Sequence, residues 1–315
     1  MPDNSRNVDR LPDEIARLMT ELDSEAGVAV KMAISVKAHF GSSAMLDSPI
    51  VNLSGYRFVH LDDLPSIQSA MKQAFIHIGM QGSVMLASEG INISIAGNRE
   101  QVAAARQWFD QDPRFADMWL KETYSAQIPY RRLRIRKRTE IIAFDGQDSE
   151  MLQAQRPVAP AVAPETLAQW LDESRDMTLL DTRNDYEIVS GTFPASIHLD
   201  IKHFRNFKEA VEKALEAGTL DPQKPMVTYC TGGIRCEKAA PWLLEKGFHE
   251  VYQIEGGLLN YLQTCGSRHW QGDCFVFDDR VELTPELQPT GAGLCDHCQL
   301  AVPAGTDCRC QLGRH

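Results

Sequence analysis

The strict alternation of short apolar segments with helical segments after residue 164 is the feature that most constrains the fold of this chain. Strands are expected at residues 178–181, 226–229 and 251–254, and helices at 164–174, 202–217 and 237–246. Strands this short and this apolar are buried on both faces, and helices between them connect strands that run parallel. Residues 165–270 are therefore predicted to form a doubly wound parallel-sheet α/β domain.

An α+β domain is predicted before this one. Strands at 56–61, 83–87 and 91–96 alternate with helices at 65–78 and 99–110, and a strand pair at 119–124 and 133–143 completes the series. This βαββαβ order is the ferredoxin-like plan, which we assign to residues 49–145. The following Pro/Ala-rich segment cannot hold a helix, which predicts a linker over residues 146–164. Residues 1–48 are expected to be a flexible extension.

Composition limits the classes of function that the chain can have. No window contains 18 consecutive apolar residues and the first thirty residues lack a signal-peptide pattern, so a cytoplasmic protein without a membrane partner is expected. The net charge of −11 argues against indiscriminate binding to nucleic acid. The segment 114–138 nevertheless carries a local charge of +6, with eight Lys/Arg against two Asp/Glu.

The basic segment alternates arginine with apolar residues. As a strand it would place Arg132, Arg134 and Arg136 on one face, where they would contact phosphates. The full set of candidate RNA-binding residues is Arg131, Arg132, Arg134, Arg136, Lys137 and Arg138. The alternative is a solvated edge strand that is basic in order to prevent aggregation.

The strongest chemical signal is a cysteine at the end of a predicted buried strand. The loop after it, Cys230-Thr231-Gly232-Gly233-Ile234-Arg235, leads into a helix that opens near Cys236. Loop amides and a helix N-terminus that converge on one point favour an anion there, and such surroundings lower the pKa of a cysteine thiol. We therefore predict Cys230 to be a reactive thiolate, with Arg235 as a fixed cation at the rim.

The length of this loop separates two chemistries. A Cys-x5-Arg loop, as in tyrosine phosphatases, holds a phosphate, whereas the four residues between Cys230 and Arg235 suit a single sulfur atom. Cys-x4-Arg after a parallel strand resembles the active-site loop of rhodanese domains, which carries a persulfide on the cysteine. The segment 179–197 also resembles the rhodanese pattern that opens the sheet. Asp181, Arg183 and Glu187 are expected to support the loop through ion pairs, and Cys236 to pack or to act as a resolving thiol.

A narrower resemblance covers residues 56 to about 281. The cysteine block with its following Gly247, Gly256 and Gly257, the segment 181–193, and the segments 86–93 and 112–117 are similar to the bacterial tRNA uridine hydroxylase (TrhO) family. The resemblance implies oxygen-dependent 5-hydroxylation of the wobble uridine, position 34, with molecular oxygen as co-substrate and Cys230 as the persulfide cysteine. It also implies a tRNA anticodon loop as partner, and a rhodanese site implies a sulfur donor.

Two other functions remain open on the residues themselves. One is a sulfurtransferase that passes sulfane sulfur from Cys230 to an acceptor, and the other is a binding module whose cysteine loop is vestigial. The intact Cys230 and Arg235 weigh against the second. The sequence contains no dinucleotide fingerprint, flavin motif or two-His-one-carboxylate set, so it does not predict how oxygen is activated.

The segment 271–315 is a cysteine-rich tail. It contains the thiol pairs Cys295/Cys298 and Cys308/Cys310, a set that is able to close a tetrahedral zinc site. Because Cys-x-Cys is shorter than the usual knuckle, His297 or His315 is a possible substitute for one sulfur. The alternatives are a disordered tail and a redox relay.

Overall fold

The computed structural model describes residues 48–144, 157–308 and 310. The expected extension, the first part of the expected linker and His315 lie outside these residues. None of the helices in the described ranges combines the length and the apolar character needed to cross a membrane.

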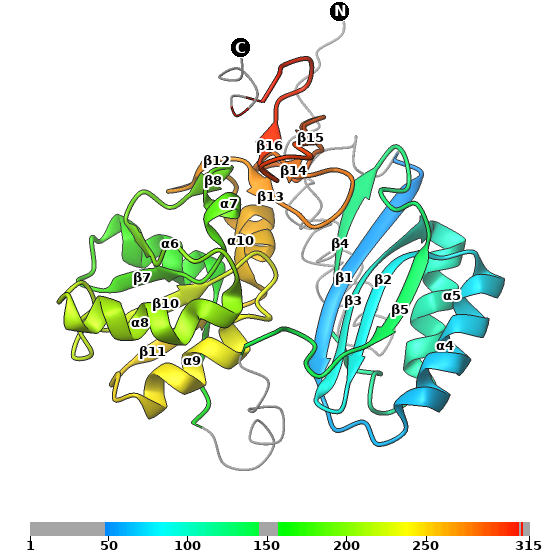
Figure 1. Cartoon of the computed structure of the whole chain (residues 1–315), viewed down its shortest axis with the longest axis horizontal. Coiled ribbons are helices and arrows are strands. Elements are labelled where there is room, and N and C mark those ends of the chain that lie inside the picture. The colour runs from blue at the N-terminus through cyan, green and yellow to red at the C-terminus, as the bar shows by residue number, and fades with distance from the viewer. Residues whose placement is uncertain (1–47, 145–156, 309, 311–315) are drawn as a thin grey trace, which may run out of the picture. The chain divides into compact units, whose positions relative to one another are not determined.

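The first domain is a five-stranded sheet with two helices on one face (Figure 1). Its elements are β1 Ile50–Phe58, α4 Leu64–Ile78, β2 Gln81–Ala87, β3 Gly90–Asn98, α5 Arg99–Asp110, β4 Leu120–Ser125 and β5 Leu133–Lys137. The strand order is β4-β1-β3-β2-β5, and β1, β2, β3 and β4 pair antiparallel. This arrangement confirms the ferredoxin-like prediction.

The expected final strand pair is wrong, because β4 and β5 lie at opposite edges of this first sheet. β4 pairs with β1, and β5 pairs in parallel with β2. Strands that follow each other in the sequence often form a hairpin. Here β4 instead pairs with the edge of β1 and β5 with the edge of β2, so the backbone groups along those two edges gain hydrogen-bond partners. The first strand also begins earlier than expected, at Ile50 rather than residue 56.

Period-two alternation decides which face of the first sheet the helices cover. Ile91, Ile93 and Ile95 of β3 are buried on the helix side. Helices α4 and α5 pack there through Phe75 and Phe109, whose ring centroids lie 5.6 Å apart. The opposite face, here called the open face, carries the polar residues that alternate with these apolar ones.

The second domain is a parallel sheet with helices on both faces (Figure 1). Its sheet contains β6 Ala161–Val162, β11 Val251–Ile254, β10 Met226–Tyr229, β7 Thr178–Asp181 and β9 Ser196–His198, in that order. Its main helices are α6 Pro164–Asp172, α8 Phe207–Glu216, α9 Cys236–Glu245 and α10 Gly257–Cys265, and its shorter ones are α7 Asp185–Ile188 and the 3-10 helix η3 Phe204–Asn206. All strand pairs run parallel, which confirms the predicted doubly wound sheet.

The end of the Pro/Ala-rich segment belongs to this second sheet. Strand β6 pairs with β11 at the sheet edge, and Ala159 and Val162 are buried. Small side chains bury little area, but an edge strand gains its stability from backbone hydrogen bonds, which the composition does not show. The remaining strands form three short pairs: β8 Gly191–Thr192 with β12 Gln271–Gly272, β13 Cys274–Phe275 with β14 Glu282–Leu283, and β15 Gly293–Leu294 with β16 Ala301–Val302.

Candidate functional site

The loop 230–235, here called the cysteine loop, joins β10 to α9 and encloses the sulfur of Cys230. The Gly233 amide donates a hydrogen bond to Cys230 Sγ at 3.1 Å, and the cysteine is fully buried. Gly233 adopts a φ of 97°, which favours glycine and turns this amide toward the sulfur. The local sequence therefore builds an anion cradle around one sulfur atom.

Helix α10 holds the cysteine loop from behind. The amides of Leu258 and Leu259 donate to the carbonyls of Cys230 and Thr231, at 2.9 and 3.0 Å. Gly257 has a φ of 70°, and a Cβ there would lie 2.7 Å from the Cys230 carbonyl oxygen. Only glycine lets the helix approach the loop this closely.

The surroundings of Cys230 favour its thiolate. Burial alone would raise the pKa of Cys230, but hydrogen bonding to Cys236, the charge of Arg235 and the amides of residues 235 and 236 outweigh burial and lower it to about 5. Burial and the neighbouring Cys230 raise the pKa of Cys236 well above its usual range. At neutral pH the negative charge therefore resides on Cys230, and Cys236 is its neutral hydrogen-bonding neighbour.

Two buried ion pairs surround the loop. The Glu187 carboxylate accepts hydrogen bonds from the two terminal guanidinium nitrogens of Arg235, at 2.5 and 2.7 Å. It also accepts a hydrogen bond from the Thr231 hydroxyl at 3.1 Å. Arg183 donates to both carboxylate oxygens of Asp181, at 3.0 and 2.6 Å. Arg235 is only 4% exposed, so it lies inside the protein rather than at an open rim. The bidentate pairing with Glu187 explains this difference, because a paired guanidinium tolerates burial.

A lysine of the first domain, which the sequence analysis missed, also reaches the cysteine loop. Lys121 Nζ of β4 donates to the Gly232 carbonyl oxygen at 2.9 Å, and it lies 4.5 Å from the ring centroid of Trp119. Burial lowers the pKa of Lys121 to about 8, and the charges of Cys230 and Glu237 oppose that effect. The one available signal was a lysine within a predicted strand, but 111 residues separate Lys121 from Gly232 and no local pattern connects them.

Tyr56 of β1 is a second residue that the sequence analysis missed. Its hydroxyl donates to Glu237 Oε1 at 3.0 Å, in the first turn of α9. A Cβ on Gly233 would lie 2.9 Å from this hydroxyl, so the tyrosine also packs closely over the loop. Both missed residues connect the open face to the cysteine loop.

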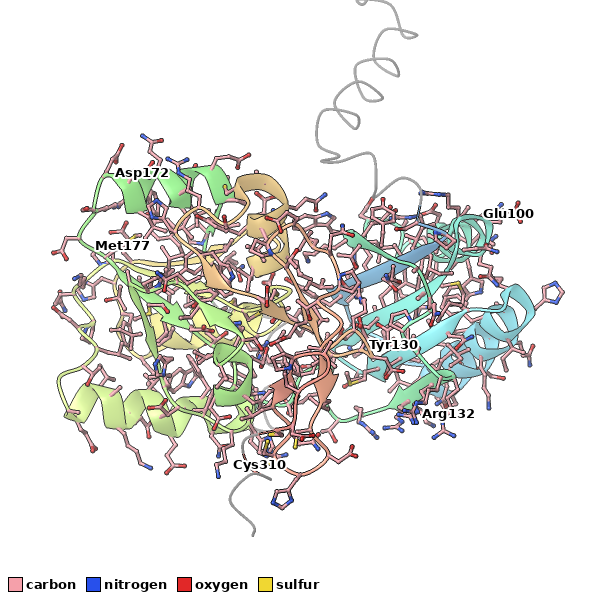
Figure 2. The ribbon with its side chains drawn as sticks, turned by 90° about the horizontal axis from the view of Figure 1, so that it is seen from above. Glu100, Tyr130, Arg132, Asp172, Met177 and Cys310 are labelled. Carbon is pink, nitrogen blue, oxygen red and sulfur yellow. The ribbon has the colours of Figure 1, made fainter. Side chains whose placement is uncertain are left out.

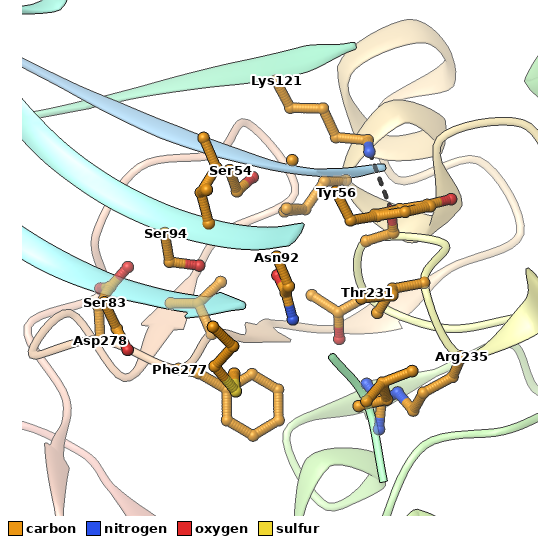
Figure 3. A pocket seen from close by; sticks show the side chains of 18 of the residues that line it. Ser54, Tyr56, Ser83, Asn92, Ser94, Lys121, Thr231, Arg235, Phe277 and Asp278 are labelled. Carbon is orange, nitrogen blue, oxygen red and sulfur yellow. Dashed lines mark hydrogen bonds between the residues drawn. The ribbon is translucent and has the colours of Figure 1, made fainter. Parts of the chain in front are cut away.

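A cavity of about 410 Å³ lies between the open face and the cysteine loop (Figure 3). From the sheet come Ser54, Ser83, Asn92 and Ser94, and from the loop come Thr231, Gly232, Ile234 and Arg235. Phe277 and Asp278, from the segment after β13, line another side. Polar and apolar groups from two domains therefore surround a space beside the cysteine loop, which is the arrangement of a small-molecule or nucleotide site.

The predicted basic stripe lies on edge strand β5 and on the residues next to its two ends. Arg131, Arg132, Arg134, Arg136, Lys137 and Arg138 are all exposed, whereas Leu133 and Ile135 are half-buried. Figure 2 shows Arg132 at the surface of the molecule. The structure thus places the stripe at an edge, where RNA binding and protection against edge pairing are both physically reasonable.

The four tail cysteines lie together around strands β15 and β16. Their sulfur atoms all lie within 4.8 Å of one another, with the sulfurs of Cys295 and Cys310 3.6 Å apart and those of Cys298 and Cys308 3.3 Å apart. In a tetrahedral zinc site with Zn–S distances of about 2.3 Å the sulfurs would be separated by roughly 3.8 Å. The four thiols therefore fit zinc without a histidine.

Two family models match the chain in the order of the two domains. A model described as UPF0176 acylphosphatase like domain matches residues 50–141, and one described as Rhodanese-like domain matches residues 163–264. The two matched segments include the whole first sheet, the second sheet except its edge strand β6, and the whole cysteine loop.

Curated relatives match both domains at once. A protein named tRNA uridine(34) hydroxylase from Cupriavidus taiwanensis is 42% identical over 258 residues, which is 80% of this chain and 89% of that protein. Proteins of the same name from Thiobacillus denitrificans and Xanthomonas euvesicatoria are each 40% identical, over 79% and 76% of this chain and 99% and 96% of their own lengths. Matches of this length extend across both sheets.

Proposed function

Because the chain belongs to the tRNA uridine(34) hydroxylase family, we propose that it hydroxylates the wobble uridine of tRNA at carbon 5. Molecular oxygen is the co-substrate, Cys230 is the reactive residue and the anticodon loop is the part of the tRNA that binds. The observation that carries this proposal is the Cys230 thiolate in a loop that forms one wall of the cavity. A tRNA substrate places the enzyme in the cytoplasm.

The cysteine loop supports a persulfide on Cys230. The thiolate attacks the sulfane sulfur of a donor, so that a new S–S bond forms while the donor's bond to that sulfur breaks and the donor leaves with the electron pair. The amides and the Arg235 charge that stabilise the thiolate also favour the terminal sulfur anion of the persulfide. Glu187 holds Thr231 and Arg235 in place directly. Arg183, paired with Asp181, supports Glu187 by donating to its backbone carbonyl.

The basic stripe supplies the contact with the tRNA backbone. Its six cations are exposed, and the rest of the chain is strongly acidic, so one surface must be dedicated to RNA. The four tail cysteines hold one zinc ion, which ties β15 and β16 together without a large apolar core. Zinc in this proposal supplies folding energy to the tail and takes no part in the hydroxylation.

Nucleoside mass spectrometry of tRNA tests the proposed reaction. A deletion strain that carries the wild-type gene should contain 5-hydroxyuridine at position 34, and the same strain with Cys230→Ser should lack it, because a serine hydroxyl neither ionises near neutral pH nor carries sulfane sulfur. Cys236→Ser should lower the level less. Loss of thiouridine instead would identify a sulfurtransferase, and unchanged tRNA in the deletion strain would identify a binding module.

A further inference from the structure

The open face of the first sheet is polar in a way that helix packing does not require. Alternation along β1, β2 and β3 places Ser54, Ser83 and Ser94 on the face opposite the buried isoleucines. Among the described residues, the hydroxyls of Ser54 and Ser83 have no hydrogen-bond partner in the protein. Both line the cavity beside the cysteine loop, so their donors and acceptors are available to a ligand.

The strand register places these serines in line with Lys121 at one edge of the sheet and with the basic stripe at the other edge. Lys121 pairs with Ser54, Ser54 with Ser94, Ser94 with Ser83, and Ser83 with Arg134. Paired residues of neighbouring strands point to the same face, so these five side chains form one row across the sheet. With strands about 4.8 Å apart the row spans roughly 19 Å. It leads from the basic stripe to the lysine that contacts the cysteine loop.

A second row lies beside the first and brings an amide into the cavity. Tyr56 pairs with Asn92, Asn92 with Met85, and Met85 with Arg136. The Asn92 amide nitrogen donates to the Ile141 carbonyl at 3.1 Å, which orients the side chain and leaves its carbonyl oxygen for another donor. Figure 3 shows Asn92 between the sheet and Thr231, with the Phe277 ring on another side. Phe277 is 60% exposed although it is aromatic.

The charged side chains that line the cavity indicate which part of a nucleotide binds there. Four Lys and Arg side chains line the cavity: Lys121 binds the Gly232 carbonyl, Arg235 binds Glu187, Arg280 binds Asp278, and Arg205 comes from η3 of the second domain and not from the sheet. The groups that remain on the sheet wall are neutral hydroxyls and an amide, which match the neutral donors and acceptors of a base edge. The unpaired arginines of β5 lie outside the cavity, where phosphates would meet them.

We propose that the open face binds single-stranded RNA of the anticodon loop, with Arg134 and Arg136 on its phosphates and the target uracil base turned out into the cavity. Asn92 and Ser94 then face the polar edge of the base, and the Phe277 ring packs on its flat side. This proposal rests on the proposed function and deepens it, because it names where the base binds. Extruding a base into a pocket of this kind is how proteins bring a reactive group to one base of a folded RNA.

Photo-crosslinking tests the position of the base directly. An anticodon stem–loop RNA with 4-thiouridine at position 34 is bound to the full-length protein without oxygen, irradiated, digested and mapped by mass spectrometry. The crosslink is expected in the peptide that holds Asn92 and Ser94, or in the one that holds Phe277. A crosslink only to residues outside the cavity overturns the proposal, even if the enzyme hydroxylates tRNA normally.

Filling the cavity separates base binding from backbone binding. Ser94→Leu should lower the hydroxylation rate at least roughly hundredfold while changing the Kd for the RNA less than about threefold, since the phosphate contacts remain. Ser54→Ala, which adds no volume, should lower the rate by roughly tenfold through one lost hydrogen bond. The matched control is Ser69→Leu, an exposed position on α4 behind the sheet.

The outcomes distinguish this inference from the proposed function. Wild-type rates in both Ser94→Leu and Ser54→Ala overturn the cavity assignment and leave the hydroxylase assignment intact. If the wild-type protein hydroxylates no tRNA, the proposed function fails, and the crosslink still decides whether the cavity holds the base.

Discussion

One peptide group connects Lys121 of the first domain to the sulfur of Cys230 in the second domain. The Gly232 carbonyl accepts from Lys121 Nζ at 2.9 Å, and the amide of the same peptide group, that of Gly233, donates to Cys230 Sγ at 3.1 Å. A hydrogen bond to the carbonyl polarises the peptide and strengthens its amide as a donor. We therefore expect Lys121 to act as a positioning residue that stabilises the thiolate through the backbone.

The pH dependence of Cys230 alkylation measures this effect. In the wild-type enzyme the rate of reaction with iodoacetamide should rise through pH 5 and level off above pH 6, because the thiolate forms above a pKa of about 5. Lys121→Met should move the midpoint upward by roughly one unit, since it removes a charged donor. Lys121→Arg is the conservative control and should restore most of the shift. An unchanged midpoint in Lys121→Met would show that the lysine only packs.

At the scale of single elements, strand β5 presents arginines on the open face and apolar residues toward α4. Gln68 of α4 donates to the Ile135 carbonyl at 2.8 Å, which secures the strand on its buried side. Arg132, Arg134 and Arg136 remain exposed. The basic residues are thus held on and next to a paired strand, and not on an irregular loop.

Replacing these three arginines with glutamate should weaken tRNA binding and flatten its dependence on salt. The logarithm of affinity falls with the logarithm of salt concentration by roughly 0.7 per phosphate contact on a single strand, so lost contacts reduce the slope. Persulfide formation at Cys230 should be unaffected. The control carries the same change of charge at Lys72, Lys213 and Lys246, which are exposed on α4, on α8 and just after α9. Wild-type affinity and slope in the triple variant would identify β5 as only a protected edge.

The described part of the cysteine-rich tail lacks a large apolar core of its own. If its four cysteines hold zinc, freshly purified reduced protein should contain about one equivalent of metal, and Cys295→Ser with Cys308→Ser should remove it. Elemental analysis gives the count. Cys265→Ser, which changes a half-buried cysteine elsewhere, is the control. Protein without metal before any chelator is added would refute the assignment.

On the scale of the whole molecule, a buried lysine joins the two domains. Lys238 of α9 lies 3.0 Å from Glu89 in the turn between β2 and β3, and 2.7 Å from Glu140 beyond β5. All three side chains are at most 6% exposed. Burial raises the pKa of Glu89, although the charge of Lys238 opposes this. One buried cation thus contacts two buried carboxylates.

Lys238→Met should destabilise the protein by about 3 kcal/mol at pH 7, because it removes the buried cation that contacts both carboxylates. A carboxyl whose folded pKa lies above its unfolded value stabilises the fold at low pH and loses that contribution as the pH rises through the folded pKa. Denaturant unfolding of Lys238→Met should therefore show a smaller loss at pH 5 than at pH 7. Lys238→Arg is the control. An equal loss at both pH values would assign the effect to packing alone.

The sequence by itself determined the elements and the chemistry that is local to them. Apolar strands of four residues, a Cys-x4-Arg loop and the glycines around it predicted the second sheet and its cysteine, since these features depend on neighbours a few residues away. The tertiary structure decided which distant residues come into contact. Lys121 meets Gly232 and the serine row meets Arg134 only because distant strands pair, and β4 and β5 occupy opposite edges although they adjoin in sequence. Local patterns encode backbone conformation, whereas contacts across more than a hundred residues depend on how whole sheets pack, which no local spacing records.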